Sequence, residues 1–116
     1  MKKFIKGFGF ALKGLIYTFC TQLNFKFHLF AGLFAVVLGI YVKLSYSDWL
    51  WISISIALVL ITELFNTAIE VLVNLVSPEY NPQAGVIKDV SAAAVLLAAI
   101  FSVLVGLLIF IPKFLN

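Results

Sequence analysis

The feature that most constrains the fold is the segment from Val90 to Ile111, which contains no charged side chain and ends at Pro112. A helix of about 20 apolar residues spans the hydrocarbon core of a bilayer. Two further apolar segments precede it, from Leu29 to Val42 and from Trp49 to Val76. With 64% hydrophobic residues among 116, the chain has more apolar surface than a small soluble core can bury. The sequence therefore predicts an all-α membrane protein.

The N-terminal segment differs from these spans because it carries lysines. At 100° per residue, Lys2, Lys6 and Lys13 lie on one side of a helix, opposite Phe4, Phe8, Leu12, Leu15 and Phe19. This pattern is typical of a helix on a membrane surface, and Lys6 and Lys13 interrupt the apolar run that a cleaved signal peptide needs. We expect a single membrane domain over residues 1–116, comprising an interfacial amphipathic helix (1–22), transmembrane helices (28–47, 49–76 and 88–112) and a cytoplasmic loop (77–87).

The distribution of lysines predicts the orientation of the chain. Three spans place the N-terminus and the second loop on one side of the membrane. That side carries Lys2, Lys3, Lys6, Lys13, Lys26 and Lys88, whereas the other side carries Lys43 and Lys113. Because cytoplasmic segments are enriched in lysine, we expect a multi-pass protein with a cytoplasmic N-terminus.

Other patterns limit the choice of partners. A net charge of +3, spread along the chain, is too small for a nucleic-acid-binding protein. The single Cys20 excludes an internal disulfide, and the single His28 excludes a zinc site with several histidines. We interpret His28 as an interfacial residue at the start of a membrane helix that needs no function. In the third span, small residues at every fourth position favour close approach of another helix, although alanines also occur there by chance: Ala94, Ala98, Ser102 and Gly106.

The second span carries the residues that suggest chemistry. At helical periodicity, polar side chains form one stripe, made of Glu63, Asn66, Thr67, Glu70 and Asn74. Carboxylates in hydrocarbon are costly, so they must be paired, hydrated, protonated or bound to a metal. A polar seam that joins helices is the structural alternative, but amides and hydroxyls serve that purpose at lower desolvation cost.

A cation lies close to this stripe in the expected topology. Lys88 and Asp89 immediately precede the third span, and Glu70 and Asn74 lie near the end of the second. This grouping suits a phosphate-bearing ligand with Mg²⁺, because lysine binds phosphate and one or two carboxylates suffice for the metal. Alternatively, Lys88 is only a lysine that extends its ammonium to the interface. No G-x-x-x-x-G-K-[ST] loop is present, so side chains must hold any nucleotide.

These motifs resemble those of a known family. The sequence ELFNTAIE at residues 63–70 is followed by Gly85, Lys88-Asp89 and the segment 92–95, and it is preceded by NFKFH at residues 24–28. Together they are similar to the signature of the small prokaryotic integral-membrane lipid kinases, the diacylglycerol kinase and undecaprenol kinase family. The resemblance covers essentially the whole chain, and NFKFH is more like the undecaprenol kinase branch.

The resemblance implies a homotrimer in the prokaryotic inner membrane that transfers the γ-phosphoryl group of ATP, with Mg²⁺, to a lipid alcohol. The lipid alcohol implied by the resemblance is undecaprenol or diacylglycerol. By similarity, Glu63 is catalytic and acts on the lipid hydroxyl, whereas Glu70 and Gln22 bind the metal. The residues implied to contact the nucleotide are Asn66, Gly85, Lys88, Asp89 and Lys13.

Two positions depart from the family pattern. Gln22 stands where the family usually has Glu, and Asn74 stands where its signature closes with Asp. Both substitutions keep the shape of the side chain and remove a negative charge, which weakens the hold on a cation. One alternative is therefore a catalytically impaired family member that acts as a binding or assembly subunit. Another is a small proton or ion conductor, since carboxylates within membranes also mark ion pathways.

Overall fold

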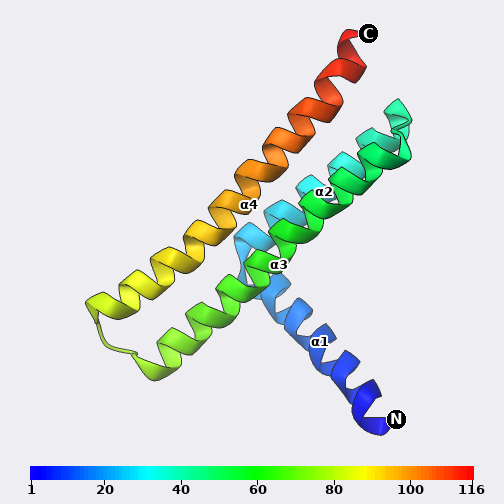
Figure 1. Cartoon of the computed structure of the whole chain (residues 1–116). Helices are drawn as coiled ribbons and strands as arrows, with labels where there is room; N and C mark the ends of the chain where they lie inside the picture. Colours follow the sequence, from blue (N-terminus) through cyan, green and yellow to red (C-terminus); the bar gives the residue numbers. More distant parts are fainter.

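A computed structural model describes all residues, 1–116, and contains four helices (Figure 1). They are α1 (Lys2–Thr21), α2 (Leu23–Val42), α3 (Tyr46–Val76) and α4 (Pro82–Leu115). By length and composition, α2, α3 and α4 are each long and apolar enough to cross a membrane. The predicted all-α architecture with three candidate spans is thereby confirmed. The apolar side chains of α1 are exposed, and its position on a membrane surface stays a prediction.

The different lengths of α2 and α3 determine how far the polar residues of α3 lie from the start of α2. In Figure 1, α4 runs beside α3, α2 lies beside the first part of α3, and α1 leaves the start of α2 at a steep angle. Because α3 has 31 residues and α2 has 20, the last turns of α3 extend beyond the start of α2. Glu63 therefore lies level with the beginning of α2, whereas Glu70 and Asn74 lie beyond it.

The turn between α2 and α3 is short and well capped. Lys43 adopts a left-handed conformation (φ 57°, ψ 63°), and its N–H donates to the carbonyls of Gly39 and Ile40. Ser45 begins α3 by accepting a hydrogen bond from the Asp48 N–H at 3.2 Å. Side-chain capping of this kind satisfies backbone N–H groups that the first helical turn leaves free. As a result, α2 ends at Val42, before the limit of 47 expected for the first span.

The connection between α3 and α4 is also shorter than the sequence suggested. The side chain of Asn81 accepts from the Gln83 N–H at 2.9 Å, and Pro82 occupies the first helical turn, where its missing N–H costs no hydrogen bond. Residues 82–87, expected in a loop over 77–87, are therefore the beginning of α4 rather than irregular chain. Where the third span enters a membrane stays a prediction.

The apolar core lies near the α2–α3 turn. Leu44, Ile52 and Val105 form a buried cluster that joins the turn, α3 and α4. Gly39 permits close approach at this end, because a Cβ there would lie 2.8 Å from both Leu44 Cδ1 and Trp49 Cη2. On the predicted ridge of small residues, Ala98 is buried, whereas Gly106 has open space at the position of a Cβ.

Candidate functional site

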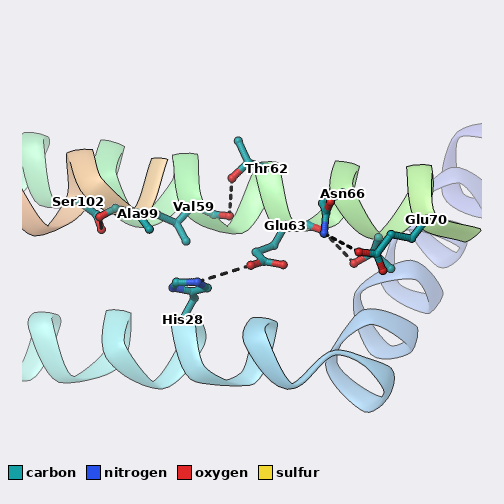
Figure 2. Close-up of polar contacts among 9 residues, drawn as sticks. His28, Val59, Thr62, Glu63, Asn66, Glu70, Ala99 and Ser102 are labelled. Carbon is teal, nitrogen blue, oxygen red and sulfur yellow. Dashed lines mark hydrogen bonds and ion pairs between the residues drawn. The ribbon is translucent and has the colours of Figure 1, made fainter. Parts of the chain in front are cut away.

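The polar stripe of α3 lies on one side of the helix, as its spacing predicted. In Figure 2, Glu63 and Glu70 point toward the side of α2, whereas Thr62 points away from it; Asn66 reaches across to Ser91 of α4. Thr67 is buried and donates its hydroxyl to the carbonyl of Glu63 at 2.9 Å, so it is satisfied within its own helix. The stripe residues left to contact other elements or a ligand are therefore the two carboxylates and the two amides.

Asn66 connects this stripe to α4. Its Nδ2 donates to Glu70 Oε1 at 3.2 Å, and its Oδ1 accepts from the Ser91 hydroxyl at 2.7 Å. An amide that uses both ends in this way has a fixed orientation. The hydrogen bond from Asn66 thereby orients the carboxylate of Glu70 through its Oε1, while its other oxygen makes no hydrogen bond within the chain.

Glu63 is the most deeply buried large residue, with 1% of the whole residue exposed. Its Oε1 atom is buried and has no hydrogen-bond partner. His28 Nε2, on α2, is 3.5 Å from this oxygen (Figure 2). The start of α2 at Leu23 places His28 in the second turn of the helix, rather than at its predicted start.

Lys88 lies at the far end of the stripe. Its Nζ donates to Asn74 Oδ1 at 2.7 Å, which joins the beginning of α4 to the end of α3. Both residues line a cavity of ≈ 200 Å³ at the α3–α4 connection, together with Gly85 and Tyr80. A Cβ at Gly85 would meet no atom within 4 Å, so the helix surface beside this residue is open.

Three of the residues implied by resemblance lie apart from these contacts. Lys13 is exposed on α1, with its Nζ 5.7 Å from the centre of the Phe10 ring. Gln22 forms the junction between α1 and α2, and its side chain makes no hydrogen bond within the chain. Asp89 is exposed on α4. Their predicted roles toward a nucleotide or metal stay predictions.

The donors fit Mg²⁺ only as a partner of a bound phosphate. No group of three or more His, Cys, Asp or Glu side chains gathers in the chain, so a metal cage built of protein alone is absent. Mg²⁺ is commonly held by one or two carboxylates, substrate phosphates and water. Glu70 offers a partly exposed carboxylate for such a site, with one oxygen already oriented by Asn66.

Sequence reasoning missed two members of the site. The sequence predicts no function for His28, although the motif NFKFH that contains it contributes to the family resemblance. Ser91 has no distinguishing pattern, because a serine near the start of an apolar span carries little signal by itself. Both residues acquire a role only through contacts with α3, to Glu63 and to Asn66.

Comparison with known proteins shows what the chain is similar to. Residues 9–110 match the family described as prokaryotic diacylglycerol kinase. An undecaprenol kinase of Bacillus subtilis (strain 168) is 39% identical over 113 residues, covering 97% of this chain and 92% of the relative. A diacylglycerol kinase of Synechocystis is 38% identical over 110 residues, covering 94% of this chain and 63% of the relative. The diacylglycerol kinase of Escherichia coli (strain K12) is 33% identical over 102 residues, covering 88% of this chain and 84% of the relative.

Proposed function

Because the chain belongs to the prokaryotic diacylglycerol kinase family, a family of lipid kinases, we propose that it transfers the γ-phosphoryl group of ATP to a membrane lipid alcohol. The acceptor is undecaprenol or diacylglycerol, and the reaction uses Mg²⁺. One observation carries this proposal: a polar stripe runs along α3 from the buried Glu63 to Asn74, where Lys88 adds a positive charge. Phosphoryl transfer requires mainly positioning and charge stabilisation, and these side chains supply both.

Glu63 is the proposed general base for the lipid hydroxyl. A base must come within hydrogen-bonding reach of the proton that it removes. An apolar groove of ≈ 690 Å³ between α1 and α3 gives room for a lipid chain, and Leu15, Leu64 and Thr67 are among the residues that line it. Thr67 is bonded to the Glu63 carbonyl, so the groove runs along the part of α3 that carries the base.

Lys88 is the proposed contact to the phosphates. Its partner Asn74 is a neutral amide, so the pair keeps a net positive charge. A carboxylate at position 74 would neutralise that charge, and the amide leaves it available to an anionic ligand. Ala84 and Gly85, in the first turn of α4, line the same cavity, where the positive end of the helix dipole also favours phosphate.

Glu70 is the proposed ligand of Mg²⁺, with the amide oxygen of Gln22 as a second, uncharged donor. When bound, the metal neutralises charge on the phosphates and orients them for in-line transfer. Asn66 keeps the Glu70 carboxylate in place through its hydrogen bond at 3.2 Å. Asp89 and Lys13 are proposed to contact the nucleotide from α4 and α1.

We place the stripe near the cytoplasmic interface, with the N-terminus cytoplasmic and α1 on the membrane surface. Many large apolar side chains of α2, α3 and α4 are exposed in the single chain, which supports further helix packing as well as contact with lipid. Accordingly, a homotrimer is the proposed assembly, with substrates enclosed between subunits.

The decisive experiment measures transfer of radiolabelled γ-phosphate from ATP to undecaprenol and to diacylglycerol in mixed micelles. We expect labelled lipid phosphate that depends on Mg²⁺ and disappears with a chelator. The preferred lipid is the one with the higher kcat/KM. The absence of labelled product with every lipid alcohol, at saturating ATP and Mg²⁺, would contradict the proposal.

A catalytically impaired family member is the second candidate, and the amides at Gln22 and Asn74 favour it. The double variant Gln22→Glu with Asn74→Asp separates the two readings. If the wild type is silent and this variant phosphorylates lipid, the chain is an impaired member that binds or assembles. If the wild type is active, the amides are compatible with catalysis and this second candidate is wrong.

A further inference from the structure

The starting point is the unsatisfied oxygen of Glu63. This side chain is 2% exposed, and its Oε1 accepts no hydrogen bond although it lies in the interior. A buried carboxylate without a hydrogen bond costs several kcal/mol, so native structures rarely keep one without a purpose. His28 Nε2 is the one basic nitrogen near it, at 3.5 Å. A shift of about half an ångström would bring the two atoms to ordinary hydrogen-bond distance.

The surroundings of His28 hold it in place. Gly32 lies one turn further along the same face of α2, and a Cβ there would be 3.2 Å from Ile56 Cγ2, so α2 approaches α3 closely beside the imidazole. Phe27 stacks edge-on against the imidazole, with ring centres 5.6 Å apart. His28 is 20% exposed and therefore keeps limited freedom to turn toward Glu63.

No other polar side chain near the imidazole is free to donate. His28 lines a cavity of ≈ 180 Å³ between α2, α3 and α4, and Ser55 and Ser102 are the hydroxyl-bearing residues in its lining. Ser55 donates to the Trp51 carbonyl at 2.9 Å, and Ser102 donates to the Ala99 carbonyl at 2.8 Å. Both hydroxyls are thus used within their own helices, so neither competes with Glu63 for the imidazole.

We infer that His28 is a positioning residue for Glu63, whose carboxylate it holds by an Nε2–H···Oε1 hydrogen bond that shortens when the site closes around its substrates. This inference rests on the proposed function of Glu63 as the base. In the reaction, the lipid O–H bond breaks and its proton passes to Glu63. The lipid oxygen forms a bond to the γ-phosphorus, and the bond to ADP breaks with its electron pair on ADP. His28 keeps its proton throughout and touches no reacting atom.

Kinetics provide the first test. His28→Leu should lower kcat roughly 10- to 100-fold, the factor expected when a hydrogen bond to a charged group is lost, and leave the KM for ATP unchanged. His28→Gln should recover most of the turnover, because its Nε2 amide also donates from the end of a side chain. The matched control is Ser55→Ala, which removes a polar group from the same cavity without reaching Glu63, and it should turn over like the wild type.

A double-mutant cycle identifies the pair. If His28 acts through Glu63, His28→Leu should have little further effect in a Glu63→Gln background. An equal loss in both backgrounds, or an unchanged kcat in His28→Leu alone, would overturn the inference.

Nuclear magnetic resonance tests the pair without activity. The chain has a single histidine, so ¹⁵N-histidine labelling in micelles gives one imidazole signal set. We expect the proton on Nε2 in the wild type and a changed tautomer balance in Glu63→Leu, with Glu63→Met, which also lacks a good acceptor, as the variant to use if Leu does not fold. A tautomer balance of His28 that is the same in the wild type and in the Glu63 variants would refute the pairing. If the wild type phosphorylates no lipid, the proposed function fails while this measurement still decides the pair.

Discussion

Two lysines of α4 contact α3, one at each end of the helix pair, and they differ in their partners. Near the α2–α3 turn, Lys113 Nζ lies 3.8 Å from Asp48 Oδ2, so opposite charges cancel. At the other end, Lys88 Nζ lies 2.7 Å from Asn74 Oδ1, so the positive charge remains. The first pair sits at the end of the bundle that holds the apolar core, and the second borders a polar cavity.

This difference separates an end that stabilises the fold from an end that is proposed to bind a ligand. At the packed end, Leu44, Ile52 and Val105 are buried and the helices approach closely at Gly39. At the polar end, Glu70 and Lys88 are satisfied only in part, and they keep charge available for a ligand. Functional sites are well placed on rigid elements that are fixed elsewhere, and the packed end provides that fixation here.

The largest expected effect is at the polar end. Glu70→Ala should lower lipid phosphorylation by roughly 10²–10³-fold, because it removes the carboxylate proposed to hold the metal. Turnover of purified protein in micelles measures it. Thr62→Val is the control on the same helix, since the Thr62 hydroxyl bonds only to the Val59 carbonyl at 2.9 Å and points away from α2 and Glu63. Similar activity in Glu70→Ala and Thr62→Val would contradict the proposed role of the polar end in catalysis.

The two lysines give the next test. Lys88→Met should raise the KM for ATP roughly 10- to 100-fold, because a charged hydrogen bond to phosphate is lost. Lys113→Met makes the same chemical change at the packed end, and it should leave the KM unchanged. There the loss is a partly exposed ion pair, worth at most about 1 kcal/mol of stability. Equal shifts of KM in both variants would mean that the amide partner has no special meaning.

A third substitution probes the packed end. Gly39→Ala should lower the free energy of unfolding by about 1–3 kcal/mol, because the added methyl group overpacks against Leu44 and Trp49. The midpoint of denaturant unfolding in micelles measures this change. Gly9→Ala on α1 is the control: no atom lies within 4 Å of its Cβ position, so the change should be neutral or slightly stabilising. Equal stability of the two variants would contradict tight packing at Gly39.

The smallest expected effect concerns the turn at the packed end. Lys43→Gly should stabilise the protein by up to about 1 kcal/mol, since glycine adopts the left-handed conformation without the steric cost that Lys43 bears at φ 57°. Lys43→Ala keeps a Cβ and should leave the unfolding midpoint near that of the wild type. A loss of stability in Lys43→Gly would show that the lysine side chain itself supports the turn.

The sequence predicted the helices and their type well, because those properties are local. The uncharged segment from Val90 to Ile111 permits only a buried or membrane-spanning helix, and the spacing of Glu63, Asn66 and Glu70 places them on one face at any helical position. The helix ends were less accurate. Asn81 and Pro82 start α4 within the expected loop, since capping depends on the conformation of a few residues rather than on hydropathy.

The sequence by itself determined that this protein is helical, apolar and marked by one polar stripe, because helical periodicity and hydrophobicity are written in neighbouring residues. Only the tertiary structure decided which side chains meet across helices: His28 with Glu63, Ser91 with Asn66, and Lys88 with Asn74. These contacts depend on the rotation and register of one helix against another. Packing at sites such as Gly32 sets both, and no pattern within a single helix encodes them.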